Sequence, residues 1–325
     1  MKLTEPTVCR TGLVVVALVL AGCGGMPDGN GAARTDTPSR ARSWMQPAGL
    51  NADLLYISDA NGEVTVYRYW HRTLLGILTG FTQPMGLCVD NRGDVYVADY
   101  GAQQIVEYSH GGTKPIGTLS TTPYNPYDCS VNPANGDLAV ANTQSGSYGG
   151  GNIAIYAHAS GRPAYYTDVN VPTYQSCVYD SDGNLLVTNG DLRRSGSATF
   201  AWLPSGGKRL LDINVPGPNP SWSWYYLEGL QWDGKFFVLD DQSGLYRVAL
   251  LKGQLFYVGY TYLNIESPSA YWVYNNNPKQ QGTQIVGAYD SGASYYKYPD
   301  GGNALYYISH GIDNPAGVTV SLKKR

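Results

Sequence analysis

The sequence predicts an all-β fold, a six-bladed β-propeller of four-stranded antiparallel blades. A short apolar, β-rich run ending in Asp or Asn recurs six times at intervals of 40 to 51 residues, the spacing of one four-stranded blade. The composition of 28 Tyr, 40 Gly and 19 Pro suits strands and turns, and no segment keeps a 3.6-residue apolar period. The six runs are residues 54–59, 94–99, 137–142, 184–189, 235–240 and 283–290.

Each run is expected to be the second strand of a blade, preceded by an inner strand and a tight turn. The segment PMGLCVD (84–90) shows the pattern, and the turn NRGD that follows it has the residue types of a β-hairpin. The other inner strands are predicted at 126–132, 174–180, 227–233 and, more weakly, 269–275.

A third strand is expected after each run, and an outer strand after that. Paired glycines follow several of the third strands and supply the positive φ of a turn, as in HGG, SGG and DGG. The third strands are predicted at 64–69, 104–108, 152–157, 198–203, 244–250 and 293–298.

The two ends of the repeat complement each other. The first unit starts at Leu54 with a second-strand run and has no inner strand of its own. The segment NPAGVTV (314–320) matches the inner-strand pattern and is left over at the C-terminus. We therefore expect the last strand to complete the first blade and close the ring, which removes exposed sheet edges.

The N-terminus has the features of an export signal. Its apolar run, 13–20, is too short to span a membrane, and it ends in Leu-Ala-Gly-Cys. That tetrapeptide resembles the bacterial lipobox, which implies removal of residues 1–22 and lipidation of Cys23; the alternative is an ordinary signal peptide with a chance Cys. Residues 23–48 are expected to be a flexible tether, and 49–325 the propeller. Gly24 follows where an inner-membrane retention signal has Asp, so the resemblance favours the outer membrane of a two-membrane envelope.

The clearest repeat, Gln83 to Asp99, resembles an NHL repeat. It carries the pattern P-x-G-apolar-x-apolar-D followed by G-D-apolar-Y-V-A-D. The resemblance extends over about 49–322, by spacing more than by letters in the later blades. It implies a six-bladed propeller and leaves the activity open, because propellers serve many unrelated functions.

The residues that end the six runs are predicted to form a polar ring on one face of the disk, near the channel. Such a ring could bind a polar ligand or a divalent cation such as calcium. Alternatively, each side chain caps a strand end by accepting hydrogen bonds from the backbone N–H groups of its own blade. The ring residues are Asp59, Asp99, Asn142, Asn189, Asp240 and Asp290.

A loop on the same predicted face is rich in aromatic residues. The segment 216–226 reads PGPNPSWSWYY, and aromatic side chains on a proline-stiffened loop suit stacking on a sugar or docking on a protein. The alternative is that the loop folds over the channel mouth and buries them. The candidate ligand-binding aromatics are Trp222, Trp224, Tyr225 and Tyr226.

Glu228 is a weak candidate metal ligand. Its segment, LEGLQWD (227–233), resembles the Glu-Gly strand of regucalcin and gluconolactonase propellers, where Glu, Asn and Asp from different inner strands hold a divalent metal. The other two ligands find no match, so the resemblance disfavours a metal-dependent lactonase. The corresponding positions here are Met85, Tyr127, Gln175, Ala270 and Ala316.

Three cysteines fall in the predicted propeller. Cys129 and Cys177 share a register on adjacent inner strands, whereas Cys88 is shifted by one position and is expected to face the opposite way. We interpret all three as small packing residues. A Cys129–Cys177 disulfide is possible in an exported protein, but it is disfavoured because neighbouring blades splay apart.

These features favour an exported, lipid-anchored binding module for a protein or carbohydrate ligand, monomeric and without a catalytic residue or a required cofactor. The formal net charge of −3 gives no basic field for nucleic acid, and the four histidines are too scattered to build a catalytic centre. Two alternatives stay open: a metal-dependent hydrolase or lyase of the lactonase-like propeller type, and a purely structural envelope protein.

Overall fold

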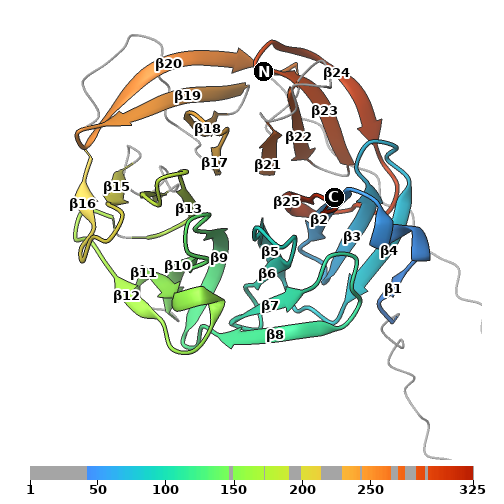
Figure 1. The fold of residues 1–325 in the computed structure, drawn as a ribbon, viewed down its shortest axis with the longest axis horizontal. Coiled ribbons are helices and arrows are strands. Elements are labelled where there is room, and N and C mark those ends of the chain that lie inside the picture. Colours follow the sequence, from blue (N-terminus) through green and yellow to red (C-terminus); the bar gives the residue numbers. More distant parts are fainter. Residues whose placement is uncertain are drawn as a thin grey trace, which may run out of the picture. The chain divides into compact units, whose positions relative to one another are not determined.

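The protein is an all-β propeller in the computed structural model (Figure 1). All described residues belong to one compact unit, residues 40–325. The structure describes residues 42–145, 149–171, 173–189, 199–213, 229–241, 244–264, 270–274, 283–289 and 292–324.

The strands pair into one five-stranded and five four-stranded antiparallel sheets, which we number as blades 1 to 6. Blade 1 has the order β1 (Trp44–Met45), β4 (Leu74–Thr79), β3 (Glu63–Arg68), β2 (Leu54–Asp59), β25 (Pro315–Ser321). Blade 2 is β5 (Pro84–Val89), β6 (Val95–Asp99), β7 (Gln104–Tyr108), β8 (Pro115–Ser120). Blade 3 is β9 (Tyr124–Val131), β10 (Leu138–Ser145), β11 (Gly149–Tyr156), β12 (Ala164–Tyr166).

The remaining blades follow the same inner-to-outer order along the chain. Blade 4 is β13 (Ser176–Tyr179), β14 (Leu185–Thr188), β15 (Phe200–Leu203), β16 (Leu211–Asp212). Blade 5 is β17 (Leu230–Trp232), β18 (Phe237–Asp241), β19 (Gly244–Leu251), β20 (Gln254–Tyr262). Blade 6 is β21 (Ala270–Tyr274), β22 (Thr283–Tyr289), β23 (Gly292–Tyr298), β24 (Gly301–Ile308).

The C-terminal strand closes the ring, as the sequence predicts. Strand β25 pairs antiparallel with β2, with Leu54 opposite Ser321 and Ile57 opposite Val318. The first and last segments of the propeller are therefore held together by a hydrogen-bonded ladder. The inner strands of the six blades surround the centre of the disk (Figure 1).

The first blade differs from the prediction by one strand. Trp44 and Met45 form β1, which pairs with the outer edge of β4 opposite Ile77 and Gly76. A Cβ at Gly76 would lie 2.6 Å from the Trp44 carbonyl oxygen, so glycine permits this close approach. The sheet thus begins inside the segment predicted to be tether, and a short 3₁₀-helix, Pro47–Asn51, leads into blade 1.

The core lies between adjacent blades. Second strands are its most buried elements, and every residue of β2 and β14 is buried. One hydrophobic cluster joins blades 1 and 2 through Tyr56, Val64 and Val97, and equivalent clusters join the other pairs. Because both faces of each blade are covered by neighbours, these strands are apolar throughout instead of alternating.

The interpretation of all three propeller cysteines as packing residues was wrong for Cys88 and Cys129, and the one bridge considered, Cys129–Cys177, does not form. Cys88 bonds to Cys129, with a Cα–Cα distance of 5.6 Å, and Cys177 is a buried free thiol. Two residues meet between adjacent blades only if each side chain points toward the other blade. In a ring of similar blades, such partners therefore lie on opposite faces of their respective sheets. The one-position shift between Cys88 and Cys129 provides this arrangement. Cys129 and Cys177 share a register, point the same way and cannot meet.

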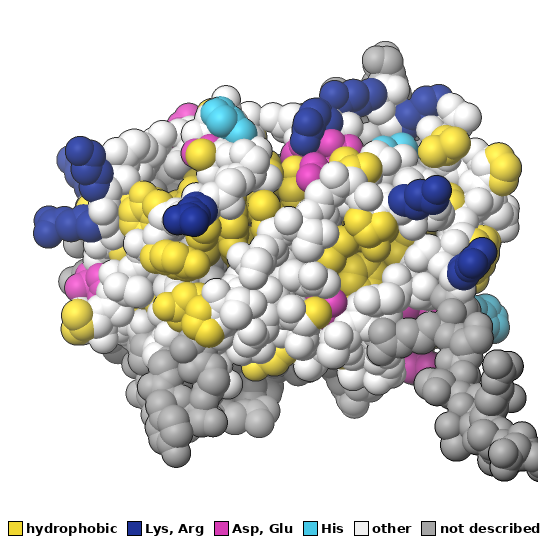
Figure 2. Space-filling model, turned by 90° about the horizontal axis from the view of Figure 1, so that it is seen from below, with side chains coloured by type: hydrophobic (Ala, Val, Ile, Leu, Met, Phe, Trp, Pro, Cys, Tyr) yellow, Lys and Arg dark blue, Asp and Glu magenta, His cyan; other side chains and the backbone are white. Residues whose placement is uncertain are grey.

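The rim of the disk carries the outer strands. Figure 2 views it from the side of β8, where bands of apolar side chains alternate with polar surface and Lys and Arg side chains project. Within the described ranges, no helix has the length and apolarity needed to cross a membrane.

Candidate functional site

The predicted polar ring lies at the starts of the inner strands, and its carboxylates bind backbone. Asp99 is fully buried and accepts hydrogen bonds from the N–H groups of Thr82 and Gln83, at 2.9–3.1 Å. Asp59 accepts hydrogen bonds from the N–H groups of Asp313 and Asn314 at 2.8 and 3.1 Å. In both blades the donors precede the inner strand, so each carboxylate holds the entry to that strand.

The other described ring residues are also bonded within their own blades. The Gly229 N–H donates to Asp240 Oδ1 at 2.9 Å, and the Thr199 N–H donates to Asn189 Oδ1 at 3.1 Å. Asn142 Nδ2 donates to Asn152 Oδ1 at 2.9 Å. All five described ring side chains are buried. For the three Asp residues and Asn189 this geometry fits the capping alternative, whereas the buried Oδ1 of Asn142 has no hydrogen-bond partner among the described residues.

The channel is narrow at this end, which we call the ring end. A cavity of only about 40 Å³ remains there, lined by the starts of the inner strands. Glycine backbones pack against neighbouring strands, and a Cβ at Gly86 would lie 2.6 Å from Asp128 Oδ1. The cavity that the described residues form at the ring end is thus too small for a drug-sized or sugar-sized ligand.

Asp128 is a further buried acidic residue at the ring end, in addition to the ring carboxylates. The Ser176 hydroxyl donates to Asp128 Oδ2 at 2.5 Å, and the Cys129 N–H donates to Oδ1 at 2.8 Å. Ser176 Oγ in turn accepts from the Leu230 N–H at 3.0 Å, so the carboxylate links blades 3, 4 and 5. Burial raises the pKa of Asp128 from 3.8 to about 6, although these donors lower it.

The opposite end, which we call the wide end, contains a cavity of about 370 Å³. Its wall comes from all six inner strands, and the β5–β6 turn at Asp90 to Gly93 and Leu322 lie around it. This volume falls in the range of small-molecule sites. Of the ring-end and wide-end cavities, which the described residues form near the axis, the wide-end cavity is the larger.

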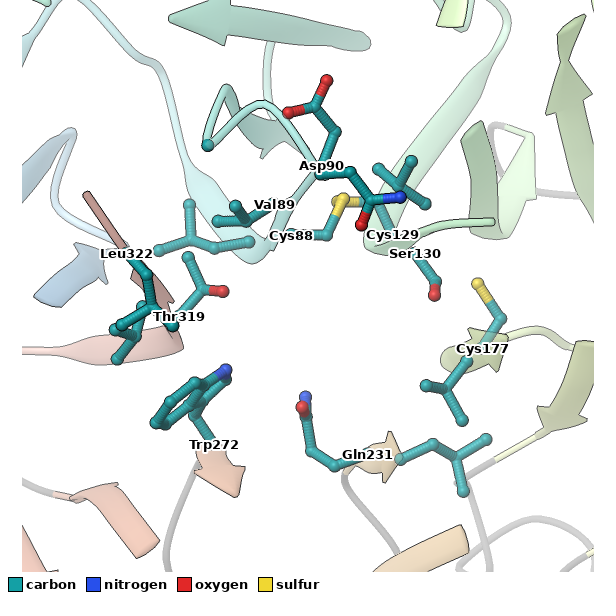
Figure 3. Close-up of a pocket in the computed structure, with 17 residues that line it drawn as sticks. Cys88, Val89, Asp90, Cys129, Ser130, Cys177, Gln231, Trp272, Thr319 and Leu322 are labelled. Atoms are coloured by element: carbon teal, nitrogen blue, oxygen red, sulfur yellow. A yellow bond between two sulfur atoms is a disulfide. The ribbon is translucent and has the colours of Figure 1, made fainter. Parts of the chain in front are cut away.

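Neutral polar side chains from four blades face this cavity. Figure 3 shows the Ser130 and Thr319 hydroxyls, the Gln231 amide and the Trp272 indole nitrogen directed toward its centre. Ser130 Oγ accepts from the Tyr179 N–H at 3.0 Å, which fixes its position. In the described part of the chain, the Gln231 amide has no hydrogen-bond partner and is only partly buried. It can donate to and accept from a ligand.

Trp272 is held in place by aromatic packing. Its ring meets Tyr69 edge to face, with a centroid distance of 5.6 Å and an angle of 82°. Such a contact orients the indole and leaves its polar edge at the cavity. Trp272 and Gln231 therefore place the edge of an indole and an amide side by side on adjacent inner strands.

The charged group nearest the cavity is already paired. Asp90 Oδ2 accepts from Arg92 Nε at 2.8 Å, and Oδ1 accepts from the Arg92 and Asp94 N–H groups. Figure 3 shows the Asp90 carboxylate turned away from the cavity centre. The arrangement suits an uncharged polar ligand better than an ion.

Several predicted site residues lie outside the described residues. These are the lipidation site Cys23, the ring residue Asp290, the weak metal candidate Glu228 and the loop aromatics Trp222, Trp224, Tyr225 and Tyr226. Among the residues that the structure does describe, no three His, Cys, Asp or Glu side chains are grouped to hold a metal ion. The described ring carboxylates are thus spread around the disk.

The cavity residues are uncharged and lie within strands, so neither charge nor loop composition marks them in the sequence. Their register in the inner strands does mark them. Each lies two residues before the polar residue at the end of the inner-strand pattern: Ser130 before Asn132, Gln231 before Asp233, and Thr319 before Ser321. Equivalent positions of a propeller line its axis together. Gln231 is the unusual member, because Cys88 and Val178 occupy the same position in blades 2 and 4.

Comparisons with known proteins agree with this fold. Residues 81–108, which contain β5 to β7, match the NHL repeat. A solved structure titled as a nidogen/laminin complex has 14% identity and a TM-score of 0.61, and the match covers 84% of this chain and 100% of that one. No curated protein matches the sequence.

Two further solved structures are similar in fold. A functionally unknown protein from Desulfotomaculum acetoxidans has 10% identity and a TM-score of 0.58, covering 84% of this chain and 100% of that chain. The Cps50 (Swd1) β-propeller domain of Myceliophthora thermophila has 10% identity and a TM-score of 0.53, covering 86% and 89%. At these identities the similarity concerns the fold alone.

Proposed function

We propose that this propeller is a binding module whose wide-end cavity recognises an uncharged saccharide, as the end or branch of a glycan. The observation that carries the proposal is the unpaired Gln231 amide beside the Trp272 indole in a cavity of about 370 Å³. Sugar hydroxyls need amide and hydroxyl partners, and the edge of the Trp272 indole borders the same space. The scaffold provides recognition through rigid inner strands.

A glycan array probed with the full mature chain tests this proposal. We expect binding to neutral glycans, and loss of that binding in Gln231→Ala and Trp272→Phe. Thr319→Val serves as a milder third variant, because it removes one hydroxyl and keeps the shape. Binding that survives all three variants, or binding only to charged glycans, would contradict the cavity assignment.

The second part of the proposal concerns location. The lipobox-like Leu-Ala-Gly-Cys sequence supports export and attachment of a lipid at Cys23 to the cell envelope. Intact-mass measurement of protein purified from membranes is expected to show loss of residues 1–22 and addition of acyl chains. A Cys23→Ser variant should be released from the membrane fraction. An unmodified chain would contradict the anchor and leave the cavity proposal standing.

A protein ligand is the second candidate, because a similar propeller fold occurs in the nidogen/laminin complex structure. It is distinguished by pull-down from a deglycosylated envelope extract, where a protein ligand persists and a glycan ligand is lost. The metal-dependent hydrolase or lyase alternative requires a tightly bound divalent ion. Elemental analysis after dialysis tests it, and about one equivalent of metal per chain would direct mutagenesis to Glu228 and the ring carboxylates.

A further inference from the structure

The outer strands of blades 5 and 6 form an exposed apolar ridge. Among the described residues, fourteen large hydrophobic side chains are exposed, and eight of them lie on β19, β20 and β24. We call these eight the rim ridge: Leu251, Phe256, Tyr257, Val258, Tyr262, Leu305, Tyr306 and Tyr307.

The ridge presents apolar groups on both faces of its strands. Residues 256–258 and 305–307 are consecutive and exposed, so successive side chains point to opposite sides of the sheet. In second strands such as β2 and β14, by contrast, both faces are covered by adjacent blades. These outer hairpins project beyond that cover, and the result is a wedge of aromatic and aliphatic groups instead of a flat patch.

The two halves of the ridge are joined. Leu263, just after β20, forms a parallel bridge with Gly302 of β24, and the Asn264 N–H donates to the Gly302 carbonyl at 2.9 Å. Thr261 Oγ1 also donates to the Pro299 carbonyl at 2.8 Å. These contacts join the end of β20 to the start of β24, and the exposed residues of the two strands extend in opposite directions along the rim from this junction (Figure 1).

The charges around the ridge are mainly positive. The hairpins of β19–β20 and β23–β24 carry Arg247, Lys252 and Lys297 against one acidic residue, Asp300, a balance of +3 − 1 = +2. The Arg72 guanidinium of blade 1 lies 3.7 Å from the centroid of the Tyr306 ring. Tyrosines beside basic groups are typical of surfaces that sit at the headgroup level of an anionic bilayer.

The chain enters the propeller on the adjoining rim. Strand β1 lies on the outer edge of blade 1, which contacts blade 6 through a cluster containing Tyr67, Tyr295 and Ile308. Only residues 24–43 separate Cys23 from β1. If this segment behaves as a random coil, its mean end-to-end distance is about 25 Å. A lipid at Cys23 would therefore keep this rim close to the membrane.

We propose that the rim ridge is a membrane-docking surface that lies at the headgroup level of the bilayer holding the lipid anchor. The inference rests on the anchor proposed above. Docking on blades 5 and 6 would hold the disk on its edge, so the wide-end cavity faces sideways and stays open to ligands. Tyrosine and Phe256 rings would occupy the interface, and Lys252 and Lys297 would pair with anionic headgroups.

Site-directed spin labelling of the intact lipidated chain tests docking. Labels replace Tyr262 (Tyr262→Cys), Leu305 (Leu305→Cys) or, as the matched control, the exposed Ile116 on β8 of blade 2 (Ile116→Cys). The buried thiol is removed in all three by Cys177→Ala. In vesicles of phosphatidylethanolamine with a minority of phosphatidylglycerol, power saturation compares collisions with oxygen and with a water-soluble nickel chelate.

We expect a several-fold higher ratio of oxygen to nickel accessibility at positions 262 and 305 than at 116. Equal, water-like accessibility at all three positions would overturn the proposal, as would dipolar broadening that assigns the ridge to a second copy. The acyl mass on Cys23 and glycan binding are read from the same samples. Failure of the anchor, of the cavity or of docking alone is therefore distinguishable.

Discussion

The two ends of the channel use polar groups in opposite ways. The ring end contains more of them, including Asp59, Asp99 and Asp240, but these accept backbone N–H groups in a buried setting. The wide end has fewer, and Gln231 among them is unpaired. The cavities differ in the same direction, about 40 Å³ against about 370 Å³. Available hydrogen-bonding capacity, not the density of polar groups, distinguishes a site from a scaffold.

Asp99→Ala should give the largest effect and tests the ring end. The N–H groups of Thr82 and Gln83 lose an acceptor that is a fully buried carboxylate, and each costs on the order of 1–3 kcal/mol, so we expect a loss of about 4 kcal/mol in the free energy of unfolding. Urea denaturation measures it. Asp300→Ala, on an exposed turn, is the control and should change stability by less than about 0.5 kcal/mol. A small effect of Asp99→Ala would return the ring to the ligand-binding interpretation.

Removing the disulfide tests how much it stabilises the channel wall, because it joins the inner strands of blades 2 and 3. The bond joins blades 2 and 3 and closes a loop with a sequence separation of 41, so Cys88→Ala with Cys129→Ala should cost about 3 kcal/mol. Denaturation with and without reductant checks the size and sign. Cys177→Ala is the control and should lose as much stability on reduction as the wild type, because it keeps the disulfide, whereas the double variant should be insensitive to reductant. A wild-type protein unaffected by reductant would contradict a structural disulfide.

Asp128 allows a pH test of the ring end. Its pKa is about 6 in the folded protein and 3.8 unfolded, so the folded state binds more protons between these values. Stability should therefore fall as the pH rises from 4 to above 6, by on the order of 3 kcal/mol from this group. Below pH 3.8 Asp128 causes no further change of stability with pH, because it is protonated in both the folded and the unfolded state.

The difference in stability between wild type and Asp128→Asn isolates this contribution, because other titrating groups cancel. We expect the difference to change with pH in that window and to be constant above about pH 7. Chemical denaturation across pH measures it. A difference independent of pH would contradict the raised pKa.

The smallest effect is expected at the wide end. Gln231 has no partner in the described structure, so Gln231→Ala should change stability by less than about 0.5 kcal/mol and weaken glycan binding about tenfold. Titration calorimetry and denaturation of the same sample separate the two readouts. A large loss of stability with unchanged affinity would assign Gln231 to the scaffold.

The sequence predicted the features that repeat. Second strands, third strands and closure by residues 314–320 follow from a pattern present in every blade, and the structure confirms them. Strand β1 was missed because two residues carry no period, and its pairing depends on the glycine opposite.

The site was harder to predict, since its informative residue breaks the repeat. Gln231 becomes visible only when Ser130 and Thr319 are known to face the same cavity. The disulfide was missed for a related reason: Cys88 and Cys129 meet because their registers differ, and the pattern of a single blade does not show this. A repeat pattern predicts the strands within each blade. It does not predict which side chains of different blades meet, because that depends on how the blades pack in space.

The most direct test compares the two ends with one ligand. Calorimetric affinity for a neutral glycan identified on the array is measured for wild type, Gln231→Ala and Asp99→Asn, the last keeping one acceptor oxygen at the ring end. We predict about a tenfold loss for Gln231→Ala and no change for Asp99→Asn at a temperature where all three are folded. The reverse pattern would place the ligand at the ring end and contradict the assignment of the wide-end cavity.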